Sequence, residues 1–267
     1  MVESAWVRIA LRATSALVLL FLYLPLVILA VYAFNPSRLQ VWPPTGFTLD
    51  WFAEAAANPA IRRALVNSVL AGLGATSIAL VLGTLAALAV QRFAFFGRET
   101  ISFLFVLPIA LPGVVTGIAL RTTFQTAGID LGLGTIIVGH ATFCVVIAYN
   151  NVIARLRRLP HTPEEASADL GADSWTTFRR ITLPRLGTAL LSGGLLAFAL
   201  SFDEIIVTNF TAGPGTQTIP MWILTGIQRP TELPVVNVVA FLLILLSTIP
   251  VYFAQRISTA AGGGGRI

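Results

Sequence analysis

Lysine is missing from this sequence, because all seventeen of its basic residues are arginine. A P-loop needs a lysine on the phosphates of its nucleotide, and Schiff-base chemistry needs a lysine amine. Neither kind of site can be built from this chain. We therefore expect no catalytic residue here, and we expect that the chain does not hydrolyse ATP itself.

Cysteine and charge are also scarce. The one cysteine, Cys144, lies in an apolar run, so no disulfide can form within the chain. Charged residues make up 11% of the sequence and hydrophobic residues 56%, whereas soluble domains carry about 25% charged residues. This composition excludes an ordinary soluble domain and indicates a lipid environment. The pI near 10.3 does not indicate nucleic-acid binding, because the arginines lie at the ends of apolar stretches.

Six apolar runs are long enough to cross a bilayer, which takes roughly 20 helical residues. We expect a single all-α, polytopic membrane domain over residues 1–267, with a surface or re-entrant helix at 219–227 and a flexible glycine-rich tail at its end. The six predicted spans cover residues 13–34, 64–90, 100–120, 131–154, 186–210 and 233–254. Small-residue pairs such as Gly113 with Gly117 favour close helix packing.

The arginines also predict an orientation. With six spans both termini share a side, and that side collects twelve arginines against five on the other. Because cytoplasmic loops are enriched in positive charge, we expect both termini in the cytoplasm. The first run lacks a small-residue cleavage site before a polar region, so we interpret it as a retained helix and not as a signal peptide.

The longest cytoplasmic loop, residues 155–185, has a helical pattern of its own. Thr162, Pro163 and Glu165 form a capping-box pattern that predicts the start of a short helix. That helix should end near Gly171, and Asp173 or Ser174 can cap a second short helix before Pro184. Exposed apolar side chains on such a pair would need a partner's groove.

The same loop resembles the EAA loop of ATP-binding-cassette (ABC) importer permeases. The residues Glu165-Ala166-Ser167 are followed after three residues by Gly171 and after nine more by Ile181-Thr182-Leu183-Pro184, which is the family's spacing with Ser167 in place of an alanine. The resemblance implies a type I importer permease fold, with this loop docking on an ATPase subunit. The residues expected to couple to the ATPase are Glu165, Ala166, Ser167, Gly171, Trp175, Phe178, Ile181, Leu183 and Pro184.

The resemblance implies a complex in the bacterial inner membrane. It would contain two ATPase subunits that bind ATP and Mg²⁺, a second permease subunit expected to be a different chain, and an extracytoplasmic solute-binding protein. This chain would hold no cofactor or metal of its own. Further patterns at Leu111-Pro112-Gly113, at Ser201-Phe202-Asp203-Glu204 and at Thr211-Ala212-Gly213-Pro214-Gly215 are similar to those of spermidine/putrescine permeases. Related permeases for ferric iron, thiosulfate or other solutes share parts of these patterns and remain alternatives.

Two carboxylates, Asp203 and Glu204, fall inside the predicted fifth span. An acid at membrane depth is costly unless it faces water or a partner, so we predict that at least one of them lines the substrate pathway. The competing interpretation is that one of them pairs with an arginine or caps a helix end. His140 lacks metal-site spacing, and we interpret it as a packed, hydrogen-bonded histidine.

Two other classes of membrane protein stay open at this point. An ion-coupled secondary transporter would usually show inverted repeats, which the sequence lacks, and the EAA-type loop argues against it. A membrane-embedded enzyme would need a clustered catalytic set, and the spans offer only Asp203, Glu204 and His140.

Overall fold

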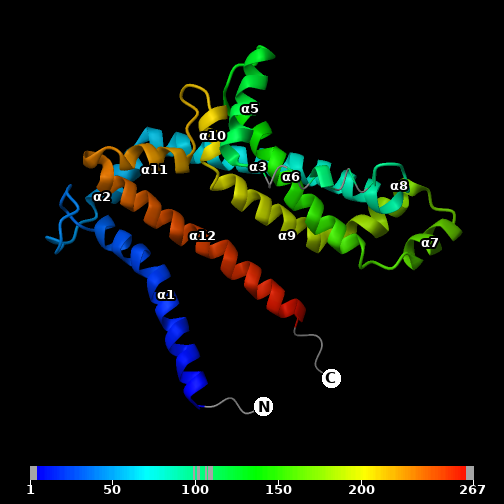
Figure 1. The fold of residues 1–267 in the computed structure, drawn as a ribbon, viewed down its shortest axis with the longest axis horizontal. Helices are drawn as coiled ribbons and strands as arrows, with labels where there is room; N and C mark the ends of the chain where they lie inside the picture. Colours follow the sequence, from blue (N-terminus) through cyan, green and yellow to red (C-terminus); the bar gives the residue numbers. More distant parts are fainter. Residues whose placement is uncertain (1–4, 99, 101–102, 106, 108–110, 263–267) are drawn as a thin grey trace. The chain divides into compact units, whose positions relative to one another are not determined.

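The computed structural model describes residues 5–98, 100, 103–105, 107 and 111–262, and every regular element within them is a helix (Figure 1). This confirms the predicted all-α class. Five described helices are long and apolar enough to cross a membrane: Trp6–Ala33, Pro59–Arg92, Leu133–Leu156, Ser174–Phe202 and Pro230–Ser247. The chain divides into two compact units, which are residues 1–61 with 223–267, and residues 62–222.

The predicted third span is the one missing from those five. Residues 101–102, 106 and 108–110 of that span lie outside the described residues. The described remainder contains α5 (Gly113–Thr126), which begins after Pro112 and continues past the predicted end at residue 120. The count of six spans therefore stays a prediction.

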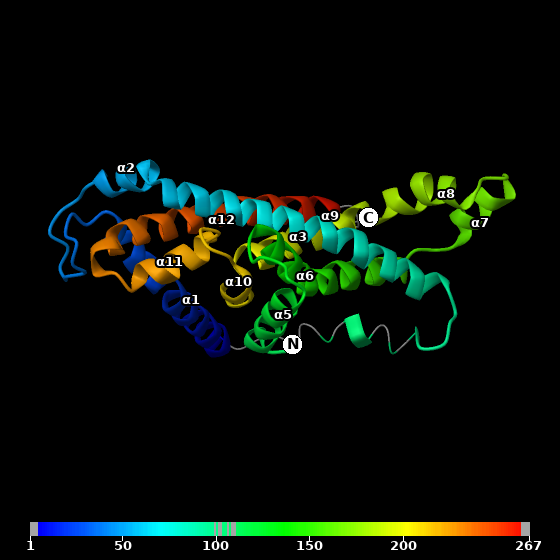
Figure 2. The same cartoon turned by 90° about the horizontal axis from the view of Figure 1, so that it is seen from above.

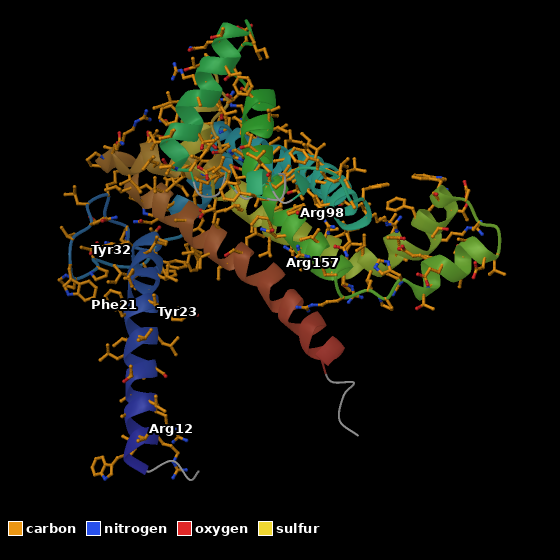
Figure 3. All side chains as sticks on the ribbon, turned by 45° about the vertical axis from the view of Figure 1, so that its right-hand side comes forward. Arg12, Phe21, Tyr23, Tyr32, Arg98 and Arg157 are labelled. Atoms are coloured by element: carbon orange, nitrogen blue, oxygen red, sulfur yellow. The ribbon has the colours of Figure 1, made fainter. Side chains whose placement is uncertain are left out.

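The first unit is built from α1 (Ala5–Ala33), α2 (Asp50–Ala57), the 3₁₀ turn η2 (Pro230–Glu232) and α12 (Leu233–Gly262). Helix α12 packs against both α1 and α2. Aromatic contacts add to this packing: the Phe34 ring stacks on that of Phe47 at 4.9 Å and meets that of Phe241 on α12 edge to face at 5.6 Å, centroid to centroid. Along α1, Phe21 and Tyr23 extend away from the helix between Arg12 and Tyr32 (Figure 3). Their exposed rings suit a surface that faces lipid.

The loop after α1 is ordered around one buried side chain. The Oδ1 atom of Asn35 accepts hydrogen bonds from the backbone and the hydroxyl of Thr45, and the Trp51 indole donates to the Asn35 carbonyl at 2.9 Å. The Trp51 ring is buried under Arg38, whose guanidinium lies 5.0 Å from the ring centroid. Trp42 is exposed, as an interfacial residue would be.

The core of the second unit lies between α3 (Pro59–Arg92), α6 (Leu133–Leu156) and α9 (Leu183–Phe202), which run side by side in Figures 1 and 2. Small residues bring these helices together. A Cβ at Gly83 of α3 would lie 2.8 Å from both Ala148 Cβ and Tyr149 N of α6, so only glycine allows this approach. Gly117 on α5 likewise meets the Phe210 ring of α10 (Ile206–Thr211), as the small-residue pattern predicted.

Two short helices, α7 (Thr162–Asp169) and α8 (Ser174–Thr177), lie beyond the ends of α6 and α9 (Figure 2). They form the loop that the sequence predicted over residues 155–185. Helix α11 (Ile219–Ile227) has the bounds predicted for a short helix.

Candidate functional site

The first candidate site is the loop that contains α7 and α8. Helix α7 begins at Thr162 with Pro163 in its first turn, but its N-cap is His161 and no side chain caps it. The predicted capping box is therefore wrong by one residue. The carboxylate of Glu164, which would be the capping acid in this register, instead accepts a 2.6 Å hydrogen bond from Thr182 Oγ1 and a 2.6 Å charged bond from Arg92. The Glu164 carboxylate therefore bonds to residues that are distant in the sequence and does not cap its own helix.

The turn between the two short helices has the predicted glycine at its centre. Gly171 has φ +79°, a conformation that costs L side chains roughly 1–2 kcal/mol. Across the turn, the buried Ser167 and Thr177 hydroxyls lie 2.9 Å apart and form a hydrogen bond. Asp173 caps α8 by accepting from Thr176 N at 3.0 Å, as predicted, and these hydrogen bonds from Thr176 lower the pKa of the Asp173 carboxyl.

The second short helix is not a separate element. Residues Ser174–Phe202 form one continuous helix, in which a π-helical turn, η1 (Phe178–Thr182), joins α8 to α9. Pro184 was expected to end a short helix, but it stands in the first turn of α9 directly after η1. A π turn widens the helix, which accommodates a proline ring that would clash in a regular helix. The α8 part of the loop is therefore continuous with the fifth span.

The predicted coupling residues divide into an exposed and a supporting set. Leu170 beside the turn is 89% exposed and Trp175 is 64% exposed, with the Trp175 ring 5.7 Å from that of the half-buried Phe178. Glu165, Ala166 and Pro184 are also exposed, whereas Ser167 is buried and Ile181 and Leu183 are half-buried. Exposed apolar side chains such as Leu170 and Trp175 at the end of a helix pair suit docking to another protein.

Sequence reasoning missed the group of Arg92, Glu164 and Thr182. Arg92 ends α3, and its guanidinium donates to both Glu164 Oε1 and Thr182 Oγ1, at 2.6 Å and 2.9 Å. The three residues join the end of the second span to α7 and to η1. Glu164 could have been noticed as the acid beside the EAA-type motif, but no local pattern pairs it with an arginine 72 positions away.

The second candidate site is the pair Asp203 and Glu204. The fifth span ends at Phe202, eight residues before its predicted end, and the chain restarts as α10 at Ile206. The two acids therefore lie in a helix break and not inside a span. Asp203 is the exposed C-cap residue of α9, whereas the half-buried Glu204 accepts a 2.9 Å hydrogen bond from Val207 N at the start of α10.

His140 on α6 lies behind this break and is packed and hydrogen-bonded, as predicted. Its ring is fully buried, with Nδ1 2.7 Å from Ser201 Oγ and Nε2 2.8 Å from Thr208 Oγ1. Among the described residues, no group of three or more His, Cys, Asp or Glu side chains could hold a metal ion.

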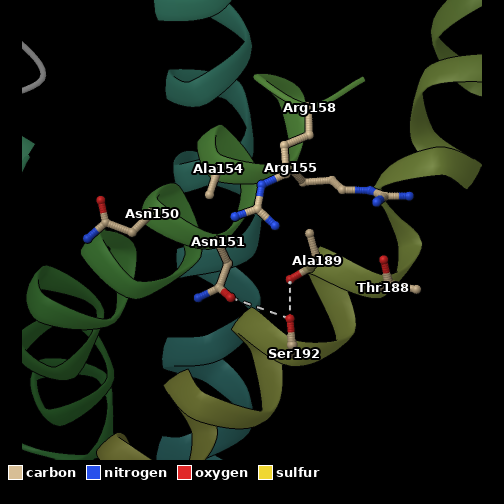
Figure 4. Close-up of a pocket in the computed structure, with 8 residues that line it drawn as sticks. All are labelled: Asn150, Asn151, Ala154, Arg155, Arg158, Thr188, Ala189 and Ser192. Atoms are coloured by element: carbon tan, nitrogen blue, oxygen red, sulfur yellow. Dashed lines mark hydrogen bonds between the residues drawn. The ribbon is translucent and has the colours of Figure 1, made fainter. Parts of the chain in front are cut away.

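A polar pocket opens at the other end of α6 and α9, close to the loop (Figure 4). It has a volume of about 400 Å³. Ser192 on α9 faces Asn151 on α6 across it, with an Oγ to Oδ1 distance of 3.4 Å, and Arg155 is held by a bond from Nε to the Arg185 carbonyl. Polar side chains on a shared face avoid acyl chains, so this face suits a water-filled path or a protein contact. The lining residues are Asn150, Asn151, Ala154, Arg155, Arg158, Thr188, Ala189 and Ser192.

Comparison with known proteins gives consistent results. Residues 79–261 match the family model described as "Binding-protein-dependent transport system inner membrane component". The putrescine transport system permease protein PotI of Escherichia coli (strain K12) is 35% identical over 232 residues, which are 84% of this chain and 82% of that protein. The spermidine/putrescine transport system permease protein PotC of the same strain is 32% identical over 239 residues, 89% of each chain. A crystal structure of a bacterial ABC transporter that imports the acidic polysaccharide alginate superimposes with a TM-score of 0.74 at 14% identity, over 96% of this chain and 99% of that one.

Proposed function

Because the chain belongs to the family of binding-protein-dependent transport system inner membrane components, we propose that it is the permease of an ABC importer whose substrate is a polyamine such as putrescine or spermidine. Membership confirms the importer-permease family that the EAA-type loop predicted, and it places the chain in the inner membrane as a transport subunit and not an enzyme. The alternative of an ion-coupled secondary transporter is not favoured.

The observation that carries the polyamine proposal is the acid pair at the break between α9 and α10. Two adjacent carboxylates occupy backbone outside a regular helix, and Asp203 is exposed. Non-helical backbone at membrane depth is tolerated where it lines a water-filled cavity. A carboxylate there would replace part of the hydration that an ammonium group loses on entering the pathway. The names of the relatives at 32–35% identity point to the same substrate class.

The partners follow from the family. A binding-protein-dependent permease works with an extracytoplasmic binding protein and with ATPase subunits, and we propose two ATPases and a second, different permease in this complex. The ATPases bind the nucleotide and Mg²⁺. Closure of the ATPases would press on Leu170 and Trp175, and the continuous helix from Ser174 to Phe202 would carry that displacement to the acid pair.

Charge-neutralising variants test the substrate class. A carboxylate about 4 Å from an ammonium interacts by about 1 kcal/mol in water and about 4 kcal/mol near a protein surface. We therefore expect Asp203→Asn to lower polyamine uptake at least about fivefold. Glu204→Gln keeps an oxygen for Val207 N and removes only the charge. Uptake by the full complex is measured with labelled putrescine, beside basal ATP hydrolysis.

The control is Asp130→Asn, which removes an exposed acid from a loop before α6. It should leave uptake unchanged. If Asp203→Asn and Glu204→Gln both import putrescine at the wild-type rate, or if the cognate binding protein takes only anions, then the acid pair has a structural role and the polyamine proposal is wrong.

A further inference from the structure

One imidazole contacts both sides of the break between α9 and α10. Ser201 lies two residues before Asp203, and Thr208 lies four residues after Glu204. Both hydroxyls are hydrogen-bonded to His140, through Nδ1 at 2.7 Å and Nε2 at 2.8 Å. Ser201, His140 and Thr208 are 2%, 0% and 0% exposed, so water does not compete for these bonds.

The hydrogen bonds around His140 determine which atom donates and which atom accepts in each bond. The Thr208 hydroxyl donates its one proton to the backbone carbonyl of Glu204 at 2.8 Å. Thr208 must therefore accept from His140, so that Nε2 carries the ring proton and the bare Nδ1 accepts from Ser201. The result is a directed series of bonds from Ser201 through His140 and Thr208 to the backbone of Glu204.

Other contacts hold α10 against α6. Thr135 Oγ1 donates to the Thr211 carbonyl at 2.7 Å. A Cβ at Gly139 would lie 3.1 Å from Val207 Cγ1, so glycine permits the close approach of the two helices. Ile205, Ile206 and Val207 continue the apolar run of α9, and the contacts with α6 add to the local bond from Val207 N to Glu204 in holding the break.

We propose that His140 is a positioning residue, which holds the ends of α9 and α10 in one arrangement and so determines where Asp203 and Glu204 present their carboxylates. The transport consequence rests on the proposed function of those acids. The effect of His140 on the position of residue 203 does not rest on that proposed function, because it concerns the backbone between α9 and α10. Substrate itself is not expected to touch the buried ring.

Two substitutions separate the two bonds. The amide of His140→Asn reaches the place of Nδ1 and can keep Ser201, whereas that of His140→Gln reaches the place of Nε2 and can keep Thr208. His140→Phe removes both bonds at similar size. Ser201→Ala and Thr208→Val remove the same bonds from the other side, which keeps the test available if the phenylalanine variant does not assemble. Thr142→Val is the control, because that hydroxyl bonds only within α6, to the Gly139 carbonyl.

The readout is the position of residue 203. Asp203→Cys in the purified complex is labelled with a charged thiol reagent, and the native Cys144 is fully buried and should stay silent. We expect His140→Phe to change the labelling rate at least about fivefold, since buried hydrogen bonds are lost. Thr208→Val should do the same, because it removes both the bond to His140 and the bond to the Glu204 carbonyl. Thr142→Val should label at the parent rate.

A second readout links position to transport. Without the cysteine substitution, His140→Phe should lower the solute imported per ATP hydrolysed and leave the KM nearly unchanged, since the binding protein determines the affinity. If His140→Phe and Thr208→Val are both labelled at the rate of the parent Asp203→Cys protein, the proposal is wrong. Changed labelling together with unimpaired uptake by Asp203→Asn would keep His140 as a positioning residue and reject the acid pair as a polyamine site.

Discussion

At the residue scale, Gly171 and Gly187 both have open space where a side chain would begin, but they differ in the backbone angle φ. A Cβ at either Gly171 or Gly187 would meet no atom within 4 Å, but only Gly171 has a positive φ, at +79°. We expect Gly171→Ala to destabilise the turn between α7 and α8 by about 1 kcal/mol, which corresponds to an increase in local amide exchange of about fivefold. Gly187→Ala, within α9, should be neutral or slightly stabilising. Hydrogen exchange of residues 162–177 in the assembled complex measures both. Equal exchange in the two variants would mean that the angle at Gly171 carries no strain.

For single residues, the sequence predicted correctly the features whose cause lies within a few residues along the chain. The turn at Gly171 and the Asp173 cap follow from the conformational preferences of those residues, and both are present. The polar role of His140 was predicted, but its two partners were not, because Ser201 and Thr208 are 61 and 68 positions away. Glu204 accepts a hydrogen bond from Val207 N at the start of α10, which agrees with the helix-end interpretation, whereas a pathway role for Asp203 or Glu204 stays a prediction.

At the scale of elements, the group of Arg92, Glu164 and Thr182 fastens α7 to α3 and η1. Arg92 and Glu164 are partly exposed, so the ion pair contributes about 1 kcal/mol or less to stability. We propose that its role is geometric, and that it passes a displacement of α7 to the second span. We expect Glu164→Gln to lower solute import per ATP hydrolysed severalfold while assembly persists. Reconstituted complexes report this ratio.

Asp169→Asn is the matched control for that variant, because Asp169 is an exposed acid at the end of the same helix. An identical coupling ratio in Glu164→Gln and Asp169→Asn would show that the group is not part of the coupling path. A charge exchange, Arg92→Glu with Glu164→Arg, should recover part of the lost coupling if the pair acts through its attraction.

The errors in the predicted elements share a physical cause. Hydropathy continues through Ile205, Ile206 and Val207, so it extended the fifth span to residue 210, whereas the helix ends at Phe202. Pro184 suggested a helix end, but the π turn before it lets the helix continue. At the end of α9, contacts with another helix outweigh the local hydropathy. At Pro184, an irregular turn outweighs the local helix-breaking signal. The apolar spans themselves were predictable, because lipid requires backbone bonds to be made within each helix.

At the scale of the whole molecule, the orientation in the membrane rests on twelve arginines against five. This orientation determines whether the surface around Leu170 and Trp175 faces ATPases and whether substrate meets the acid pair from outside. We expect Gln40→Cys to react with a membrane-impermeant thiol reagent in intact cells and Ala168→Cys to react only after the membrane is opened. Both side chains are exposed, and the native Cys144 is buried, so background labelling is low. Gln40 is preferable to the neighbouring Thr45, whose hydroxyl and N–H both bond Asn35. The reverse pattern would put α7 and α8 outside the cell, where no ATPase could dock, and would overturn the orientation together with the coupling role of the loop.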